Sequence, residues 1–422
     1  MTLLDNVDAE IRTILSGALD GEEISWREGL RLCETSGIDL QATVLAADEL
    51  RRRQTGDVVT YVINRNVNFT NVCVKHCGFC AFSRAYRSEQ GYFLPMDEIL
   101  RRTQEAADLG ATEVCMQAGL PPDIDGSFYI ELTRAVKQAL PNVHIHAFSP
   151  EEVLYGATRS GSSIRDYLTA LKDAGLGSLP GTSAEILDQE VRDVISPGRI
   201  TVKQWIEVIT TAHNLGIPTT STIMYGHMET AVHWVKHMNL LRDIQHDTHG
   251  FTEFVPLSMV YQEAPMYHHR LAPNLRPGPS GNEVVKMHAV ARLMLGASIK
   301  NIQSSWVKEG PRLAQYLLSA GANDVGGTLM NESISTSAGA QYGQLIQPRE
   351  LRRLIRDAGR IPAQRRTNYD LLKVYNSADE EITELDLVTS ADARFGSYHK
   401  LASSEDFRFL STKTQRHCSG GL

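Results

Sequence analysis

The fold of this chain is decided by a phrase of the kind AADLGATEVCMQ, residues 106–117. A helical pattern stops at Gly110, and glycine is typical of the left-handed position that ends a helix. The run 113–117 that follows is rich in residues that favour strands. We therefore expect a helix that passes within a few residues into a short strand.

The same phrase occurs five times, and each occurrence predicts a helix end followed by a strand. The five helix ends lie at Leu109-Gly110, Ala174-Gly175, Leu215-Gly216, Leu295-Gly296 and Ala320-Gly321. The strands predicted to follow them are 113–117, 177–179, 218–224, 298–304 and 325–329. Three further strands are predicted without the glycine, at 59–64, 142–148 and 252–257. The sequence thus predicts eight strands.

Helical segments separate these strands, with apolar residues three and four positions apart, as in 202–212 and 284–294. Strands that alternate with helices predict a parallel sheet. Eight such units predict an α/β fold closed into a (β/α)8 TIM-type barrel. An open doubly wound sheet could hold the same units and is the alternative.

The 422 residues exceed the roughly 250 that one such barrel needs, so extensions are expected at both ends. Residues 1–55 have the pattern of an N-terminal helical lead-in, and residues 56–372 hold the barrel. Residues 373–422 become polar and predict a weakly ordered C-terminal tail. The long loop 261–281 is rich in proline and histidine, and loops of that length are often functional lids.

Composition argues against several classes of function. The 42 basic and 50 acidic residues leave a net charge of −8, which argues against nucleic-acid and anionic-membrane partners. No run approaches 18 apolar residues, so no membrane span is expected. Acidic residues near the N-terminus argue against an export signal. Six cysteines are too few for a disulfide scaffold, and they favour a cytoplasmic location.

Three of the cysteines, Cys73, Cys77 and Cys80, fall within eight residues directly after the first predicted strand. Loops at that position lie on the C-terminal face of a barrel, where active sites form. Three thiolates can hold three irons of a [4Fe-4S] cluster and leave the fourth iron open. A structural zinc would need a fourth ligand, and His76 adjoins Cys77 too closely to converge easily. Inert buried thiols are the other alternative.

The spacing Cys-x3-Cys-x2-Cys, with Phe79 before the last cysteine, resembles the radical S-adenosylmethionine (SAM) enzymes. In that superfamily the open iron chelates the amino and carboxylate groups of SAM, and an electron from the cluster cleaves SAM to a 5′-deoxyadenosyl radical. The resemblance implies one [4Fe-4S] cluster with three cysteine ligands and SAM as a cofactor. Cluster potentials span roughly −700 to +450 mV, and because SAM cleavage needs the low end, an external low-potential reductant is implied.

Further phrases are similar to the radical SAM group that makes deazaflavin and futalosine-derived products. They are NVNFTN at 66–71, MYGHMET at 224–230, GGTLMNE at 326–332 and IPAQR at 361–365. Two more phrases, AFSR at 81–84 and NESIS at 331–335, most resemble the tyrosine-ligating enzymes of deazaflavin (coenzyme FO) biosynthesis.

This resemblance implies a transferase acting on two small molecules. The deoxyadenosyl radical would take a hydrogen from L-tyrosine, whose Cα–Cβ bond then breaks to release 2-iminoacetate. The 4-hydroxybenzyl group would add to C5 of 5-amino-6-(D-ribitylamino)uracil. A ring-closing synthase subunit is a candidate partner. The alternatives are a futalosine-pathway (menaquinone) synthase or cyclase, the ring-closing enzyme itself, and a non-catalytic iron-sulfur or zinc protein.

The same resemblance suggests residues that bind SAM. These candidates are Phe79, Gln117, Gly119 and Glu185. The turn 117–119 stands where the superfamily has a glycine-rich turn near the methionine amino group, although Ala118 replaces one glycine; a plain βα turn is the alternative. Glu185 stands where related enzymes contact SAM through a carboxylate. The run 182–185 also fits a helix capping box, which would give Glu185 a structural role instead.

Polar residues at strand ends are candidates for catalysis. They are His146, Tyr225, His227 and Glu229. The last three stand together after the fifth predicted strand, where burying unpaired polar groups would cost about 1–3 kcal/mol each, so function is favoured, with His227 as hydrogen-bond donor or base. His146 could contact substrate or be a core histidine. Glu152 fits a capping box with Ser149 better than a catalytic role.

The ends of the last two predicted strands carry polar side chains that suit a uracil and its ribityl hydroxyls. The substrate-binding candidates are Ser304, Ser305, Thr328, Asn331 and Glu332.

Overall fold

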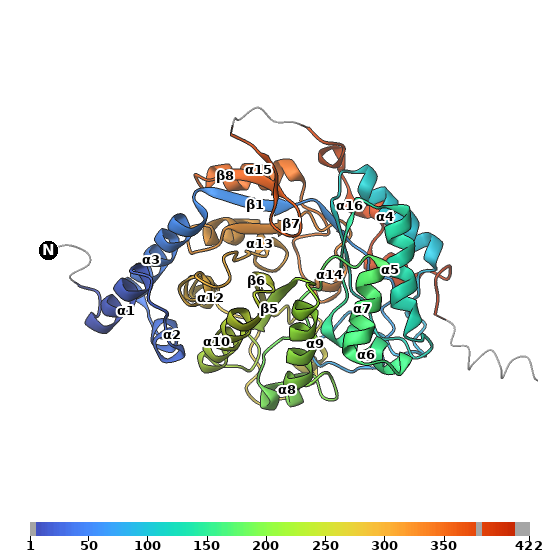
Figure 1. Ribbon diagram of the computed structural model, residues 1–422, viewed down its shortest axis with the longest axis horizontal. Helices are drawn as coiled ribbons and strands as arrows, with labels where there is room; N and C mark the ends of the chain where they lie inside the picture. The colour runs from blue at the N-terminus through green and yellow to red at the C-terminus, as the bar shows by residue number, and fades with distance from the viewer. Residues whose placement is uncertain (1–5, 377–381, 410–422) are drawn as a thin grey trace, which may run out of the picture.

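A ring of parallel strands lies at the centre of the computed structural model, which describes residues 6–376 and 382–409 (Figure 1). The strands of the ring are β1 (Val58–Val62), β2 (Asn64–Asn66), β3 (Glu113–Met116), β4 (His144–Ala147), β5 (Thr219–Tyr225), β6 (Phe251–Ser258) and β7 (Asp324–Gly327). Pairing is parallel between β1 and β7, β2 and β3, β3 and β4, and β5 and β6. β1 and β2 follow each other in the chain, and together they form the first of the eight strand positions of the ring.

Two short segments complete the ring through single backbone bridges. The bridges are His146–Ser178, Leu179–Thr219, Phe254–Ile302 and Gln303–Asp324. The bridging segments belong to the predicted strands 177–179 and 298–304, so every predicted strand takes part in one closed ring. The (β/α)8 barrel is thereby confirmed, and its closure rules out the open sheet.

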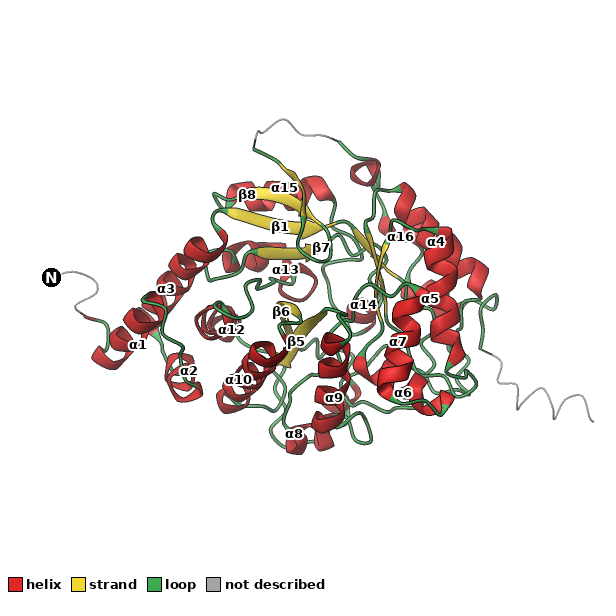
Figure 2. Ribbon diagram, viewed as in Figure 1, coloured by secondary structure: helices red, strands yellow, loops and turns green. Residues whose placement is uncertain are grey.

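Helices surround the ring (Figure 2). Between the strands lie α4 (Met96–Asp108), α5 (Ser127–Ala139), α6 (Pro150–Ser160), α7 (Ile164–Ala174), α8 (Gln189–Ile195), α9 (Val202–Asn214), α10 (Ala231–Thr248), α11 (Pro265–His268), α12 (Gly281–Leu295), α13 (Trp306–Leu317), α14 (Ile334–Ser337) and α15 (Pro348–Asp357). Gly175 ends α7 in the left-handed conformation, as its place in the repeated phrase predicts. In the described part of the chain, no helix is long and apolar enough to cross a membrane.

Three helices precede the barrel, and they cover one side of it (Figure 1). They are α1 (Ala9–Leu19), α2 (Trp26–Cys33) and α3 (Gly37–Thr55). α3 packs along α12, and α2 packs against both α10 and α12. The buried face of α1 contributes Ile11 and Ile14 to the hydrophobic core. The lead-in is therefore fixed to the barrel by apolar packing.

Two further strands, which the sequence analysis does not predict, lie beyond the ring. β8 (Ile361–Arg365) pairs parallel with β1 on the edge opposite β7, and β9 (Leu371–Val374) pairs antiparallel with β8. Gly359 precedes β8 in the left-handed conformation, so the helix-glycine-strand phrase occurs here as well. The first strand thus pairs with β8 through its beginning and with β3 through its end.

The end of β8 places Arg365 in a buried network of charges. Its guanidinium donates to both carboxylate oxygens of Asp324, at 2.6 and 3.1 Å, and lies 3.7 Å from Glu253. Tyr369 donates its hydroxyl hydrogen to Glu253, and Thr60 donates to Asp324 at 2.5 Å. Burial of charges is costly unless they are paired. This network therefore ties the starts of β1, β6 and β7 to the β8 hairpin.

Part of the predicted C-terminal tail is folded. Its short helices are η2 (Glu384–Leu387), α16 (Ala391–Phe395) and α17 (Tyr398–Ser403). The Tyr398 side chain is 2% exposed and donates its hydroxyl hydrogen to the Phe82 carbonyl at 2.8 Å. Phe395 packs under the guanidinium of Arg65, 5.0 Å from the ring centre. The weak order predicted from polarity is wrong for 382–409, because a few aromatic side chains anchor this segment; 377–381 and 410–422 lie outside the described residues.

Replacing Arg365 by methionine is expected to destabilise the barrel by about 3–5 kcal/mol, because Asp324 would stay buried without its partner. The measurement is the free energy of unfolding in urea. The matched control is Arg353→Met, whose side chain is 52% exposed and pairs with Glu350 and Asp357 at the surface. The control should lose no more than about 1 kcal/mol. Equal losses in the two variants would contradict the role given to the buried network.

Candidate active site

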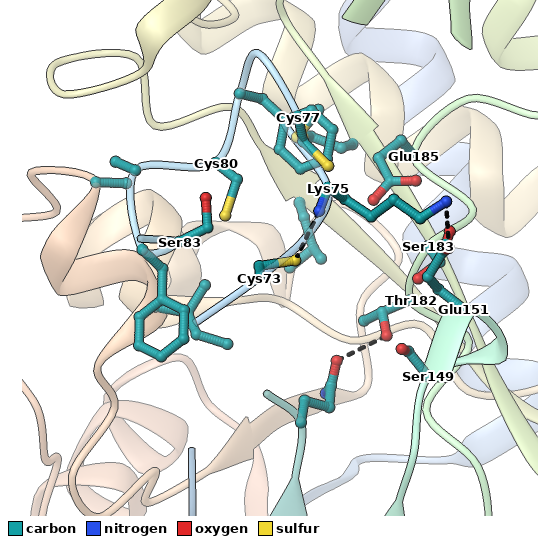
Figure 3. Close-up of a pocket in the computed structure, with 18 of the residues that line it drawn as sticks. Cys73, Lys75, Cys77, Cys80, Ser83, Ser149, Glu151, Thr182, Ser183 and Glu185 are labelled. Carbon is teal, nitrogen blue, oxygen red and sulfur yellow. Dashed lines mark hydrogen bonds and ion pairs between the residues drawn. The ribbon is translucent and has the colours of Figure 1, made fainter. Parts of the chain in front are cut away.

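A cavity of about 250 Å³ opens where the strands of the barrel end (Figure 3). The loop after β2 supplies the cysteines on one side of it. The turn after β3, the start of α6 and the loop after residue 179 supply polar side chains. The ends of β5 and β6, with α13 and α14, complete the lining. The cavity therefore lies on the face of the barrel where the cysteine motif predicts an active site.

All three clustered cysteines line this cavity. A turn between Cys77 and Cys80, closed by an N–H to carbonyl bond of 3.1 Å, gives the loop its shape. The Cys73 sulfur accepts the backbone N–H of Lys75 at 3.4 Å. Burial raises the pKa of Cys73 and raises the pKa of Cys77 to about 12, because it disfavours the charged thiolate. A cationic metal centre would reverse that preference.

The cysteine loop is held against the turn that follows β3. Gly119 donates its N–H to the Thr70 carbonyl at 2.9 Å, and Val74 donates to the Leu120 carbonyl at 2.9 Å. A Cβ atom at Gly119 would collide with the Val72 carbonyl oxygen. Glycine is therefore required at this position for the two segments to run side by side.

Glu152 anchors the same turn from α6. One of its oxygens accepts the backbone N–H of Ala118 at 3.0 Å, and the other accepts from Ser149 in a capping box. Burial raises the pKa of Glu152 to about 7. The prediction that Glu152 caps a helix is confirmed, and the cap also fixes the backbone beside the cysteines.

A cluster of paired charges forms the opposite wall of the cavity (Figure 3). Arg199 pairs with Glu185 at 2.9 Å and with Glu151 at 3.2 Å, and it donates to the Ser183 hydroxyl at 2.6 Å. Lys75 lies 3.5 Å from Glu151 and donates to the Gly198 carbonyl. We call Lys75, Glu151, Ser183, Glu185 and Arg199 the charged wall.

Two residues of the charged wall have unusual backbone conformations. Ser183 has φ 64° and Glu185 has φ 39°, in the left-handed region that disfavours side chains other than glycine. The capping box predicted for 182–185 does not form, because the next helix, α8, begins only at Gln189. Strained residues held at a cavity are typical of functional sites.

The strand-end residues predicted for catalysis lie outside the cavity lining. Glu229 accepts the backbone N–H groups of Gly226 and His227 at 2.6 and 2.8 Å, and His227 contacts the Met224 carbonyl at 3.1 Å. Tyr225 is fully buried beside this loop. Glu229 therefore holds the backbone of the loop after β5, and the Nδ1 of His227 lies 3.1 Å from its carboxylate.

His146 is also buried beneath the cavity. A hydrogen bond of 2.6 Å joins its Nδ1 to the hydroxyl of Ser178, across the gap between β4 and the next segment of the ring. Burial lowers the pKa of His146 to about 4, so the ring is neutral near pH 7. Its position fits the core histidine alternative.

Four of the five predicted substrate contacts make structural hydrogen bonds through their side chains, and Ser305 is the exception. Ser304 donates to the Ala314 carbonyl at 3.0 Å, whereas Ser305 precedes α13 as its N-cap residue without a side-chain cap bond. Thr328 donates to the Asn64 carbonyl at 3.0 Å. The Asn331 side-chain amide donates to the Gln344 side chain and to the Gly396 carbonyl. The Glu332 carboxylate accepts the backbone N–H groups of Ser335 and Thr336. None of the five lines the cavity.

The cavity instead contains polar residues that sequence reasoning missed. They are Lys75, Ser83, Ser149, Glu151, Thr182, Ser183, Arg199, Thr222, Ser258 and Lys308. Lys75 lies inside the cysteine motif, and Lys308 lies four residues after a predicted candidate, so position could have suggested both. Arg199 follows a Pro-Gly pair in a loop, where the sequence gives no signal of function.

Comparison with known proteins agrees with the cysteine motif. Residues 67–241 match the radical SAM superfamily, and residues 248–378 match the CofH/MqnC C-terminal region. A structure of the FeFe-hydrogenase maturase HydG from Carboxydothermus hydrogenoformans is similar in fold, with a TM-score of 0.65, 15% identity, and coverage of 85% of this chain and 81% of that one.

Two curated relatives are much closer in sequence. The 5-amino-6-(D-ribitylamino)uracil--L-tyrosine 4-hydroxyphenyl transferase of Methanothermobacter thermautotrophicus is 49% identical over 86% of this chain and 98% of its own length. The FO synthase of Mycobacterium tuberculosis is 48% identical over 85% of this chain but only 41% of its own length. The chain therefore belongs to the radical SAM superfamily and, within it, to the family of the 5-amino-6-(D-ribitylamino)uracil--L-tyrosine 4-hydroxyphenyl transferases.

Proposed function

We propose that this chain transfers the 4-hydroxybenzyl group of L-tyrosine to C5 of 5-amino-6-(D-ribitylamino)uracil. The products are 5-amino-5-(4-hydroxybenzyl)-6-(D-ribitylimino)-5,6-dihydrouracil, 2-iminoacetate, 5′-deoxyadenosine and methionine. The observation that carries the proposal is the placement of three thiols and the charged wall around one cavity, in a chain whose close relatives bear the transferase name. The names of these relatives favour this reaction over a reaction of the futalosine pathway.

The cysteine loop fits a [4Fe-4S] cluster. Cys73, Cys77 and Cys80 offer three thiols on one short loop at one cavity, which is the donor set such clusters take. The loop is also close-packed: a Cβ at Gly78 would lie 2.9 Å from the Cβ of Met266. A cluster held by these thiols would supply the low-potential electron that cleaves SAM.

The charged wall fits the polar groups of SAM. Its ammonium, carboxylate and ribose hydroxyls need both acceptors and donors, and Glu185, Ser183 and Arg199 provide them within one hydrogen-bonded group. The turn 117–119 adds backbone groups beside the cysteines. Phe79 lies 5.9 Å from the Arg199 guanidinium and connects the loop to the wall. We assign SAM binding to Phe79, Gln117, Gly119 and Glu185, with Ser183 and Arg199 added.

The rest of the cavity suits chemistry that must exclude water. Met224, Leu257, Val260 and Ile334 line it with apolar groups. Apolar walls keep competing hydrogen donors away from a reactive intermediate. The electron would come from an external low-potential reductant, and the product would pass to a ring-closing synthase subunit.

The Cys77→Ala variant is expected to lose most of the iron and sulfide that the wild-type protein binds after anaerobic reconstitution. The measurement is iron and sulfide per chain. The matched control is Cys115→Ala, because Cys115 lies in β3 and does not line the cavity; it should keep the wild-type content. Full iron content in Cys77→Ala, or zinc in place of iron in the wild-type protein, would contradict the cluster assignment.

The reconstituted enzyme is expected to form one adduct that contains the ribitylaminouracil and the 4-hydroxybenzyl group. The experiment supplies tyrosine, the uracil, SAM and dithionite without oxygen, and mass spectrometry identifies the products. Cleavage of SAM without this adduct would contradict the substrate assignment. An adduct formed with futalosine-pathway substrates instead would place the chain in the sister branch.

A further inference from the structure

Lys308 stands apart from the other cations of the cavity. It lies in the first turn of α13, on the side formed by the ends of β6 and of the segment 302–303. In the part of the chain that the structure describes, its ammonium forms no hydrogen bond or ion pair. Arg199 and Lys75, in contrast, are both paired with carboxylates of the charged wall. Among the described cations that line the cavity, Lys308 is therefore the one without an ion-pair partner within 4 Å.

The turn that carries Lys308 is held rigidly from two directions. The Trp306 indole donates its N–H to the Gly327 carbonyl at 2.9 Å. Ser258 at the end of β6 donates its hydroxyl hydrogen to Glu309 at 2.5 Å. Gly310 then breaks the helix with φ 79° and ψ 154°. Lys308 thus sits on a separate turn fixed between two strands.

The Lys308 side chain is partly buried, and its ammonium borders the cavity. Burial lowers the pKa of Lys308, and the nearby carboxylates of Glu309 and Glu332 only oppose that effect. Glu309 is engaged by Ser258, and Glu332 accepts backbone N–H groups of α14. A partly buried cation gains more from a bound anion than an exposed one does. This arrangement favours an anionic ligand on the side of the cavity where Lys308 lies.

The proposed reaction brings two carboxylates into the cavity, those of SAM and of tyrosine; the uracil has none. The polar groups assigned to SAM lie in the charged wall and the turn 117–119, which come from the first half of the barrel. Lys308 comes from the second half, where the other lining side chains are uncharged and mostly apolar, apart from the hydroxyls of Thr222 and Ser258. A tyrosine whose carboxylate lies at Lys308 would have its phenol and Cβ among these apolar side chains.

We propose that Lys308 binds the α-carboxylate of the tyrosine substrate. This inference rests on the proposed function and adds a specificity-determining residue to it. The ion pair selects an amino acid over its amine and fixes the end of the substrate that leaves as 2-iminoacetate. Cleavage of the Cα–Cβ bond keeps the carboxylate on that fragment, so the contact lasts through the reaction.

The test compares Lys308→Met and Lys308→Arg with the wild-type enzyme. Equilibrium dialysis measures the binding of labelled tyrosine and of tyramine, which lacks the carboxylate, to cluster-loaded protein with SAM and without reductant. We expect Lys308→Met to bind tyrosine about 10- to 100-fold more weakly, tyramine unchanged, and Lys308→Arg to recover part of the loss. The KM for SAM should stay within a factor of about two.

Lys300→Met is the matched control, since Lys300 is an exposed lysine outside the cavity. A weaker interaction of Lys308→Met with SAM or with the uracil, and wild-type affinity for tyrosine, would overturn the proposal. Equal binding of tyrosine and tyramine to the wild-type protein would overturn it even if Lys308→Met did not fold. Failure of the wild-type enzyme to form the tyrosine adduct would instead refute the proposed function.

Discussion

The site depends on the contact between the cysteine loop and the turn after β3. The backbone of the loop bonds to Gly119 and Leu120, and the missing Cβ of Gly119 lets the Val72 carbonyl lie against the turn. Glu152 then fixes the turn from α6 through the N–H of Ala118. The three thiols therefore face the cavity because two backbone segments are locked together, and not because of contacts between the thiols themselves.

Buried charged residues have different roles at the two ends of the barrel. Around Arg365, at the starts of the strands, donors and acceptors belong to the protein and satisfy one another. At the ends of the strands, the charged wall is also paired but borders the cavity, and Lys308 has no partner among the described residues. A closed network stabilises a fold, whereas a cation left open to a cavity is available to a ligand.

The strand order could be predicted from sequence because each strand carries its own local signal. β8 was missed although Gly359 marks it, because Pro362, Gln364 and Arg365 hide the apolar pattern of a strand. The cysteine cluster was found for the same reason as the strands: its spacing is local. The conformation of the turn 182–185 was harder to predict. Its residues fit a capping box, but its backbone does not enter a helix.

The other site residues were not predictable, because their role arises only when distant segments meet. Arg199 and Lys308 lie far apart in sequence and have no motif around them, yet both line the cavity. His227 and Glu229 are the opposite case: their polarity predicts function, but neither lines the cavity, and they lie 3.1 Å apart in the loop after β5. Polar residue type alone therefore does not separate a hydrogen-bonded turn from a binding site.

We propose that the loop holding Cys73, Cys77 and Cys80 carries a cluster with one iron open to SAM in the cavity of the barrel. Electron-nuclear double resonance of the reduced cluster, with SAM labelled by 17O in its carboxylate and 15N in its amino group, tests this most directly. We expect hyperfine coupling of both labels to the cluster. A fully loaded cluster that shows no coupling to either label would contradict it.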